Sequence, residues 1–152
     1  MSCCSSCGND PCPGTFGCPP LEDCDDVDAK RGFRKHRPFT RGDTITIDFD
    51  LRDPFSGQAP DVGSSQVWFT IKANLADADL NAVFQGTILS ADITPLGGPR
   101  VRVTVPATVT AMACLDGKTR LYYDLQVSYA GRVWTQEKGI FVIDPDVTRA
   151  TS

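Results

Sequence analysis

The segment LYYDLQVSYAGRVWTQEKGIFVI, residues 121–143, carries the pattern that decides the fold. Every second residue from Leu121 to Tyr129 is apolar or aromatic, which is the period of a strand with one buried and one solvated face. Ala130-Gly131 then predicts a tight turn into a strand over 132–136, and residues 139–143 form a last apolar strand. The segment therefore predicts strands joined by short turns.

Toward the N-terminus the same two-residue period recurs between clusters of turn-forming residues. It predicts strands over 45–51, 67–71 and 101–105, and a further short strand over 83–89. Two other stretches, 75–82 and 108–115, are each long enough for only one or two helical turns. About seven short strands without a long helix predict an all-β fold, a β-sandwich for which we favour an immunoglobulin-like arrangement.

Composition divides the 152 residues into two regions, 1–40 and 41–152. The chain has 41% hydrophobic and 22% charged residues, typical of a globular protein of one domain. Its net charge of -4 argues against general nucleic-acid binding, and no apolar run is long enough to cross a membrane. The first twelve residues lack the features of a secretory signal, so we expect synthesis in the cytoplasm.

The N-terminal region begins with an irregular arm rich in Cys, Pro and Gly, which has too few core-forming side chains to order itself. Six of the seven cysteines lie here: Cys3, Cys4, Cys7, Cys12, Cys18 and Cys24. Three interpretations remain open. The cysteines form disulfides, they remain free thiols in an arm held by neighbouring chains, or they hold zinc or an iron–sulfur cluster. The metal ligands would be Cys4 (or Cys3), Cys7, Cys12 and Cys18, although only one CxxC is present. The seventh, Cys114, is expected to be a small buried hydrophobic residue.

Opposite charges adjoin at the end of this region, where an acidic run over 22–28 precedes a basic run over 30–41. Such blocks indicate a solvated linker or, alternatively, a docking strip that includes Arg34 and Arg37. The single histidine, His36, lies in the basic run, where catalysis is not expected, and we predict no enzymatic activity. The tripeptide over 41–43 is interpreted as a turn.

Three aromatic residues are candidate interface residues, because the alternation places them on faces with partial exposure. They are Trp68, Tyr122 and Trp134. The alternative is that they are the residues through which the second sheet packs in the sandwich.

The C-terminal region resembles a recurrent domain of tailed bacteriophages. The motifs are LYYDLQV over 121–127, GRVWT over 131–135, GIFV over 139–142 and DVTR over 146–149, with an RGDT opening at 41–44. The resemblance implies a virion structural protein of the baseplate, tail attachment or capsid-decoration type, without catalytic residues. It also implies partners among copies of itself and other virion proteins, in a symmetric homo-oligomeric assembly of the virion, without nucleic acid or membrane.

Two other functions remain as alternatives. One is a virion module that binds a host-surface protein or glycan. The other is a small cysteine-cluster metal-binding protein, in which the sandwich serves as a carrier.

Overall fold

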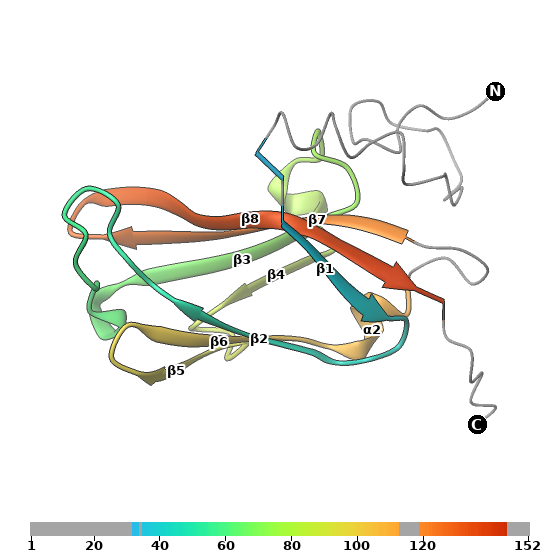
Figure 1. Cartoon of the computed structure of the whole chain (residues 1–152), viewed down its shortest axis with the longest axis horizontal. Helices are drawn as coiled ribbons and strands as arrows, with labels where there is room; N and C mark the ends of the chain where they lie inside the picture. The colour runs from blue at the N-terminus through green and yellow to red at the C-terminus, as the bar shows by residue number, and fades with distance from the viewer. Residues whose placement is uncertain (1–31, 34, 113–118, 146–152) are drawn as a thin grey trace.

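The computed structural model describes residues 32–33, 35–112 and 119–145, and in these residues eight strands form two facing sheets (Figure 1). The strands are β1 (Lys35–Thr40), β2 (Ile45–Asp50), β3 (Gln66–Lys72), β4 (Phe84–Thr87), β5 (Ile93–Gly97), β6 (Arg100–Val105), β7 (Thr119–Tyr129) and β8 (Arg132–Asp144). The short helical segments are η2 (Val62–Ser64), η3 (Asp79–Asn81) and α2 (Ala107–Thr110). The expectation of an all-β fold is confirmed at this level, and no helix in the described ranges could span a membrane.

The larger sheet has the strand order β1-β8-β7-β3-β4, and the smaller sheet has the order β2-β6-β5. β1 runs parallel to β8, whereas all other neighbours are antiparallel. The chain therefore crosses between the layers four times: from β1 to β2, from β2 to β3, from β4 to β5 and from β6 to β7. Neither sheet is continuous in sequence, so each sheet depends on pairings between strands that lie far apart in the chain.

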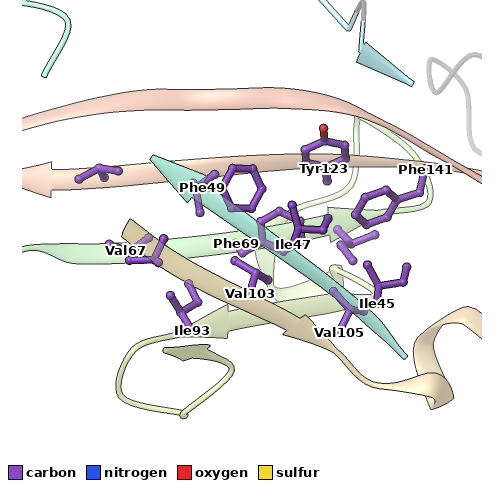
Figure 2. Close-up of a cluster of buried hydrophobic side chains, with 14 of the residues drawn as sticks. Ile45, Ile47, Phe49, Val67, Phe69, Ile93, Val103, Val105, Tyr123 and Phe141 are labelled. Atoms are coloured by element: carbon purple, nitrogen blue, oxygen red, sulfur yellow. The ribbon is translucent and has the colours of Figure 1, made fainter. Parts of the chain in front are cut away.

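The core lies between the sheets and is built from the alternate residues that the sequence period marks as buried (Figure 2). At its centre the ring of Tyr123 stacks on Phe141, with centroids 4.6 Å apart, and on Phe69 at 5.5 Å. Branched aliphatic side chains of the smaller sheet, such as Ile47 and Val103, face these rings and are buried. Burial of this apolar area, at about 25 cal/mol per Å², is the main stabilising contribution.

The β7–β8 hairpin turns through Ala130 and Gly131, whose φ angles of 51° and 76° suit a two-residue hairpin loop. The sequence predicts two strands after this turn, but the structure has the single strand β8. The register shifts so that Thr135 pairs with Gln126 and Glu137 with Leu125. Gln136 is thus the extra residue of a β-bulge, which keeps β8 paired along its length.

Lys35–Thr40, which the charge pattern assigns to a solvated linker, forms the edge strand β1 instead. Two contacts explain this correction to the boundary at residue 40. Phe39 packs edge-on against Phe141 at 5.1 Å, and the charged side chains of β1 pair with Glu137 of β8. The turn expected at 41–43 is present: Gly42 has a φ of 85°, and Asp43 N–H donates to Thr40 O.

Candidate functional site

The outer face of the larger sheet contains a shallow hollow of about 220 Å³, open to solvent. We call it the Trp68 hollow, and it is lined by Trp68, Thr70, Asp79, Gln85, Asp124, Gln126 and Val133. Four strands and the segment between β3 and β4 contribute to it. Trp68, an interface candidate from the sequence, is half-buried here and lies on the predicted face.

Strand pairing explains why these side chains converge. Residues directly opposite each other on neighbouring strands share a face of the sheet. Trp68 on β3 lies opposite Gln126 on β7. One outward position further along β3, Thr70 lies opposite Asp124 on β7 and Gln85 on β4. The hollow is therefore built mainly on two adjacent cross-strand rows, one of Trp68 and Gln126 and one of Thr70, Asp124 and Gln85.

The polar groups of the hollow are partly engaged with one another. Gln126 Nε2 donates to Asp124 Oδ2 at 3.2 Å, and Gln85 Nε2 donates to Thr70 Oγ1 at 3.4 Å. Burial raises the pKa of the Asp124 carboxyl above its ordinary value, against the opposing effects of the Gln126 hydrogen bond and the Lys72 charge. A carboxylate offers about four acceptor positions. Asp124 can therefore accept hydrogen bonds from a ligand while it keeps Gln126 in place.

Exposed apolar side chains adjoin the hollow. Val133, which lines it, is 60% exposed, and Leu80, next to the lining residue Asp79, is 87% exposed. Asp79 itself pairs with Lys72, with Oδ1 and Nζ 2.7 Å apart. The lining of the hollow is therefore mostly polar and aromatic, and Val133 is its one aliphatic residue.

A second, smaller hollow of about 160 Å³ shares Thr70 and Asp124 with the first. Phe33 and Tyr122 line it, and their rings meet edge-on at 5.4 Å. Tyr122 faces outward as predicted but is only 2% exposed. The predicted partial exposure of Tyr122 is therefore wrong, because Phe33 packs on its ring.

The predicted partial exposure of Trp134 is also wrong. Trp134 lies opposite Val127, an inward-facing residue of β7, and it belongs to the core with 7% exposure. Its indole N–H donates to Gln136 Oε1 at 3.2 Å. The alternative interpretation, that it packs within the sandwich, holds for Trp134.

Four side chains join β1 to the rest of the larger sheet, and we call them the Glu137 cluster: Lys35, Arg37, Tyr123 and Glu137. Lys35 Nζ donates to Glu137 Oε2 at 2.7 Å, and Arg37 donates to Glu137 Oε1 at 2.8 Å. Arg37 Nε also donates to the Tyr123 hydroxyl, which donates to Glu137 Oε1 at 2.7 Å. Figure 2 shows that this hydroxyl points away from the aliphatic core. Arg37, a predicted docking residue, thus makes internal contacts.

The electrostatics of this cluster favour the ionised Glu137. Burial opposes ionisation, but the hydrogen bonds from Lys35, Arg37 and Tyr123 prevail and lower the pKa of its carboxyl. Burial, together with the bond to Glu137, raises the pKa of the Tyr123 hydroxyl. The phenol therefore remains protonated and bridges the ring cluster of the core to the charges of β1.

The remaining site predictions fall on residues outside the described ranges. These are Cys3, Cys4, Cys7, Cys12, Cys18 and Cys24, together with Arg34 and Cys114. The disulfide, metal and free-thiol interpretations of the arm thus stay predictions. In residues 32–33, 35–112 and 119–145, no group of three or more His, Cys, Asp or Glu side chains is arranged to hold a metal ion. His36 lies exposed on β1.

Sequence reasoning identified Trp68 but missed Gln85, Asp124 and Gln126 beside it. The sequence pattern indicates that both β7 residues face outward, because they alternate with apolar residues along the strand. Their placement beside Trp68 depends on the pairing of β3 with β7, which no single strand pattern specifies.

No protein-family model matches the chain, and no curated protein matches its sequence.

Proposed function

We propose that this protein is a non-enzymatic structural component of a tailed-bacteriophage particle, built on an immunoglobulin-like sandwich that docks onto neighbouring proteins through its N-terminal region. The strand order supports the fold proposal. In the immunoglobulin variable type, the last two strands in the chain share a sheet with the third and fourth, and the second strand lies in the facing sheet. The orders β8-β7-β3-β4 and β2-β6-β5 follow this arrangement, with β1 beside the last strand.

The observation that carries the functional proposal is the Glu137 cluster. It attaches β1, the first described strand after the Cys-rich arm, to the sheet at two charged positions. Phe39 adds an apolar contact at the C-terminal end of the strand. These contacts fix β1 on the sandwich, which supports a docking role for the part of the chain that precedes it.

Repeated contacts in a symmetric particle need not be strong individually, because the copies add their contributions. An arm that becomes ordered on assembly bears its entropy cost at that step and covers a large area of its partner. Disulfides or a metal in the arm would then hold the assembled state. The partners are other copies of this chain and other virion proteins.

The test is incorporation into particles. Phage particles that carry the gene for this chain are purified, and the protein is quantified by mass spectrometry for wild type and for a chain that begins at residue 32. We expect many copies per particle for wild type and loss of the shortened chain, which retains the whole described sandwich.

Soluble shortened chain with an unchanged thermal unfolding midpoint serves as the control for folding. Absence of the wild-type protein from particles, or equal incorporation of the shortened chain, would refute the proposal. Non-reducing and reducing gels of the same particles then show whether the arm is cross-linked.

A further inference from the structure

We propose that the Trp68 hollow binds one neutral sugar unit of a surface glycan. This inference is independent of docking through the N-terminal region, since it concerns the outer face of the larger sheet. A sugar ring presents an apolar face of C–H groups and an edge of hydroxyl groups. The hollow offers a matching surface for each of them.

The apolar part of the match is Trp68. Trp68 is half-buried and lines the hollow, so neighbouring residues restrain it while it still contributes surface to the hollow. An aromatic face is large and rigid and carries a partial negative charge, which favours contact with polarised C–H groups at a small cost in side-chain entropy. Val133, 60% exposed, adds an apolar contact on the lining.

The polar part is the adjoining row of Thr70, Asp124 and Gln85, together with Gln126, which lies opposite Trp68. Gln85, Thr70 and Gln126 carry side chains that both donate and accept hydrogen bonds, and Asp124 accepts them. A sugar hydroxyl likewise donates and accepts, so it can bridge an amide and the carboxylate at once. The Gln126–Asp124 contact of 3.2 Å places such a pair on one strand, two residues apart.

The charges and the volume of the hollow limit the class of ligand that it can bind. Two carboxylates, Asp79 and Asp124, line the hollow and disfavour phosphates and acidic sugars. The one at Asp79 is already paired with Lys72 at 2.7 Å, which weakens the case for a basic side chain as the ligand. The volume of about 220 Å³ is below the roughly 300–1,000 Å³ of pockets for larger organic ligands. A single uncharged ring fits these limits.

The two tryptophans provide a direct test, because Trp134 is buried in the core and Trp68 lies in the hollow. In the full-length W134F variant, Trp68 is the only tryptophan. Its emission is followed during titration with galactose, glucose, N-acetylglucosamine and rhamnose, and with the oligosaccharides of a glycan array. We expect at least one neutral sugar to change the emission with saturation, and the same sugar to leave the emission of W68F unchanged.

Two substitutions on β7, a test and a matched control, show whether the sugar contacts the lining of the hollow. Gln126→Ala removes a lining amide, whereas Ser128→Ala changes the next residue on the same face, which does not line the hollow. We expect the dissociation constant to rise at least tenfold for Gln126→Ala and to stay within twofold for Ser128→Ala. If W134F does not fold, amide chemical shifts of the wild-type protein replace fluorescence, with changes expected on β3, β4 and β7.

Several outcomes overturn the inference. They are the absence of saturable binding by any neutral saccharide, equal responses of W68F and W134F, and equal weakening by both β7 substitutions. N-acetylarginine methylamide is titrated in parallel as a cationic probe. Binding of this probe alone would show that the hollow takes a basic side chain and not a sugar.

Discussion

The two faces of the larger sheet carry different kinds of side chains, although both are formed by the same strands. On β3, Phe69 points inward and is fully buried, whereas its neighbour Trp68 points outward and lines the hollow. On β7, Tyr123 points inward to the ring stack, whereas Asp124 points outward. The inner residues are apolar or aromatic, and the outer row mixes an indole with amides and a carboxylate.

This difference indicates that contact with water alone does not account for the residues on the outer face of the larger sheet. The outer face of the smaller sheet is simpler: Asp48 accepts two hydrogen bonds from Arg102 directly opposite, at 2.7 and 2.9 Å, and this interaction lowers the pKa of its carboxyl. That face presents exposed ion pairs, which contribute little to stability. The larger sheet instead has a half-buried tryptophan and a carboxyl whose pKa is raised.

The largest effect is expected from adjacent substitutions on the two faces of β3. Phe69→Ala should lower the free energy of unfolding by about 3–5 kcal/mol, because it removes a ring from the centre of the core and leaves a cavity. Trp68→Ala should cost about 1 kcal/mol, because its side chain is only half-buried. Urea denaturation measures both. Equal costs would show that the outer face belongs to the core, and the comparison would fail.

A smaller effect is expected where β1 and β7 approach β8. A Cβ at Gly139 would lie 2.6 Å from the Lys35 carbonyl oxygen and 2.7 Å from the Tyr123 hydroxyl. Gly139→Ala should therefore lower the free energy of unfolding by about 1–3 kcal/mol and increase hydrogen exchange in β1. Gly63→Ala is the control, since its nearest neighbour would lie at 3.6 Å. Unchanged exchange in β1 would contradict the tight packing of this strand.

The carboxyl groups of Glu137 and Asp124 are expected to change the pH dependence of stability in opposite directions. Glu137 has a lowered pKa, so its contribution to stability is present above its unfolded pKa of about 4.3 and is lost as the pH falls through its folded pKa. Asp124 has a raised pKa, so its ionisation costs stability above that pKa, and the cost is relieved as the pH falls through it. At pH 7, Glu137→Gln should cost about 1–2 kcal/mol, whereas Asp124→Asn should leave stability unchanged or slightly raised.

Thermal unfolding between pH 3 and pH 7, roughly the range over which carboxyl groups titrate, checks this prediction. Wild type should lose stability toward acid more steeply than Glu137→Gln does. A parallel pH dependence of the two proteins would mean that the Glu137 cluster does not hold the ionised carboxylate.

The smallest effect is expected at Leu80, which is 87% exposed and follows the lining residue Asp79 in the sequence. Leu80→Ser should change the free energy of unfolding by less than about 0.5 kcal/mol, because little apolar area is lost from the folded state. Urea denaturation measures it alongside Phe69→Ala. A cost above about 1 kcal/mol would show that η3 packs more closely than its exposure indicates.

Alternation alone was sufficient to locate most of the sandwich. The strands that became β2, β3, β4, β6 and β7 were predicted near their observed positions, since each buries one face against a single core. β5 was missed because Pro95 and Gly97 interrupt its pattern, and Pro lacks the N–H that a ladder needs. The strand Lys35–Thr40 was missed because a run of charged residues is typical of a solvated linker. Two of these charges instead form ion pairs with Glu137, about a hundred residues away in the sequence.

For this chain, local sequence determined the fold class, the strand period and the outward position of Trp68, because these depend on neighbours one or two residues apart. Apart from the β7–β8 hairpin, tertiary structure alone decided which strands pair, and hence that Gln85, Asp124 and Gln126 surround Trp68 while Tyr122 and Trp134 are buried. The physical reason is that a strand pattern specifies which side a residue faces, whereas its partner is selected by the closure of the entire sandwich.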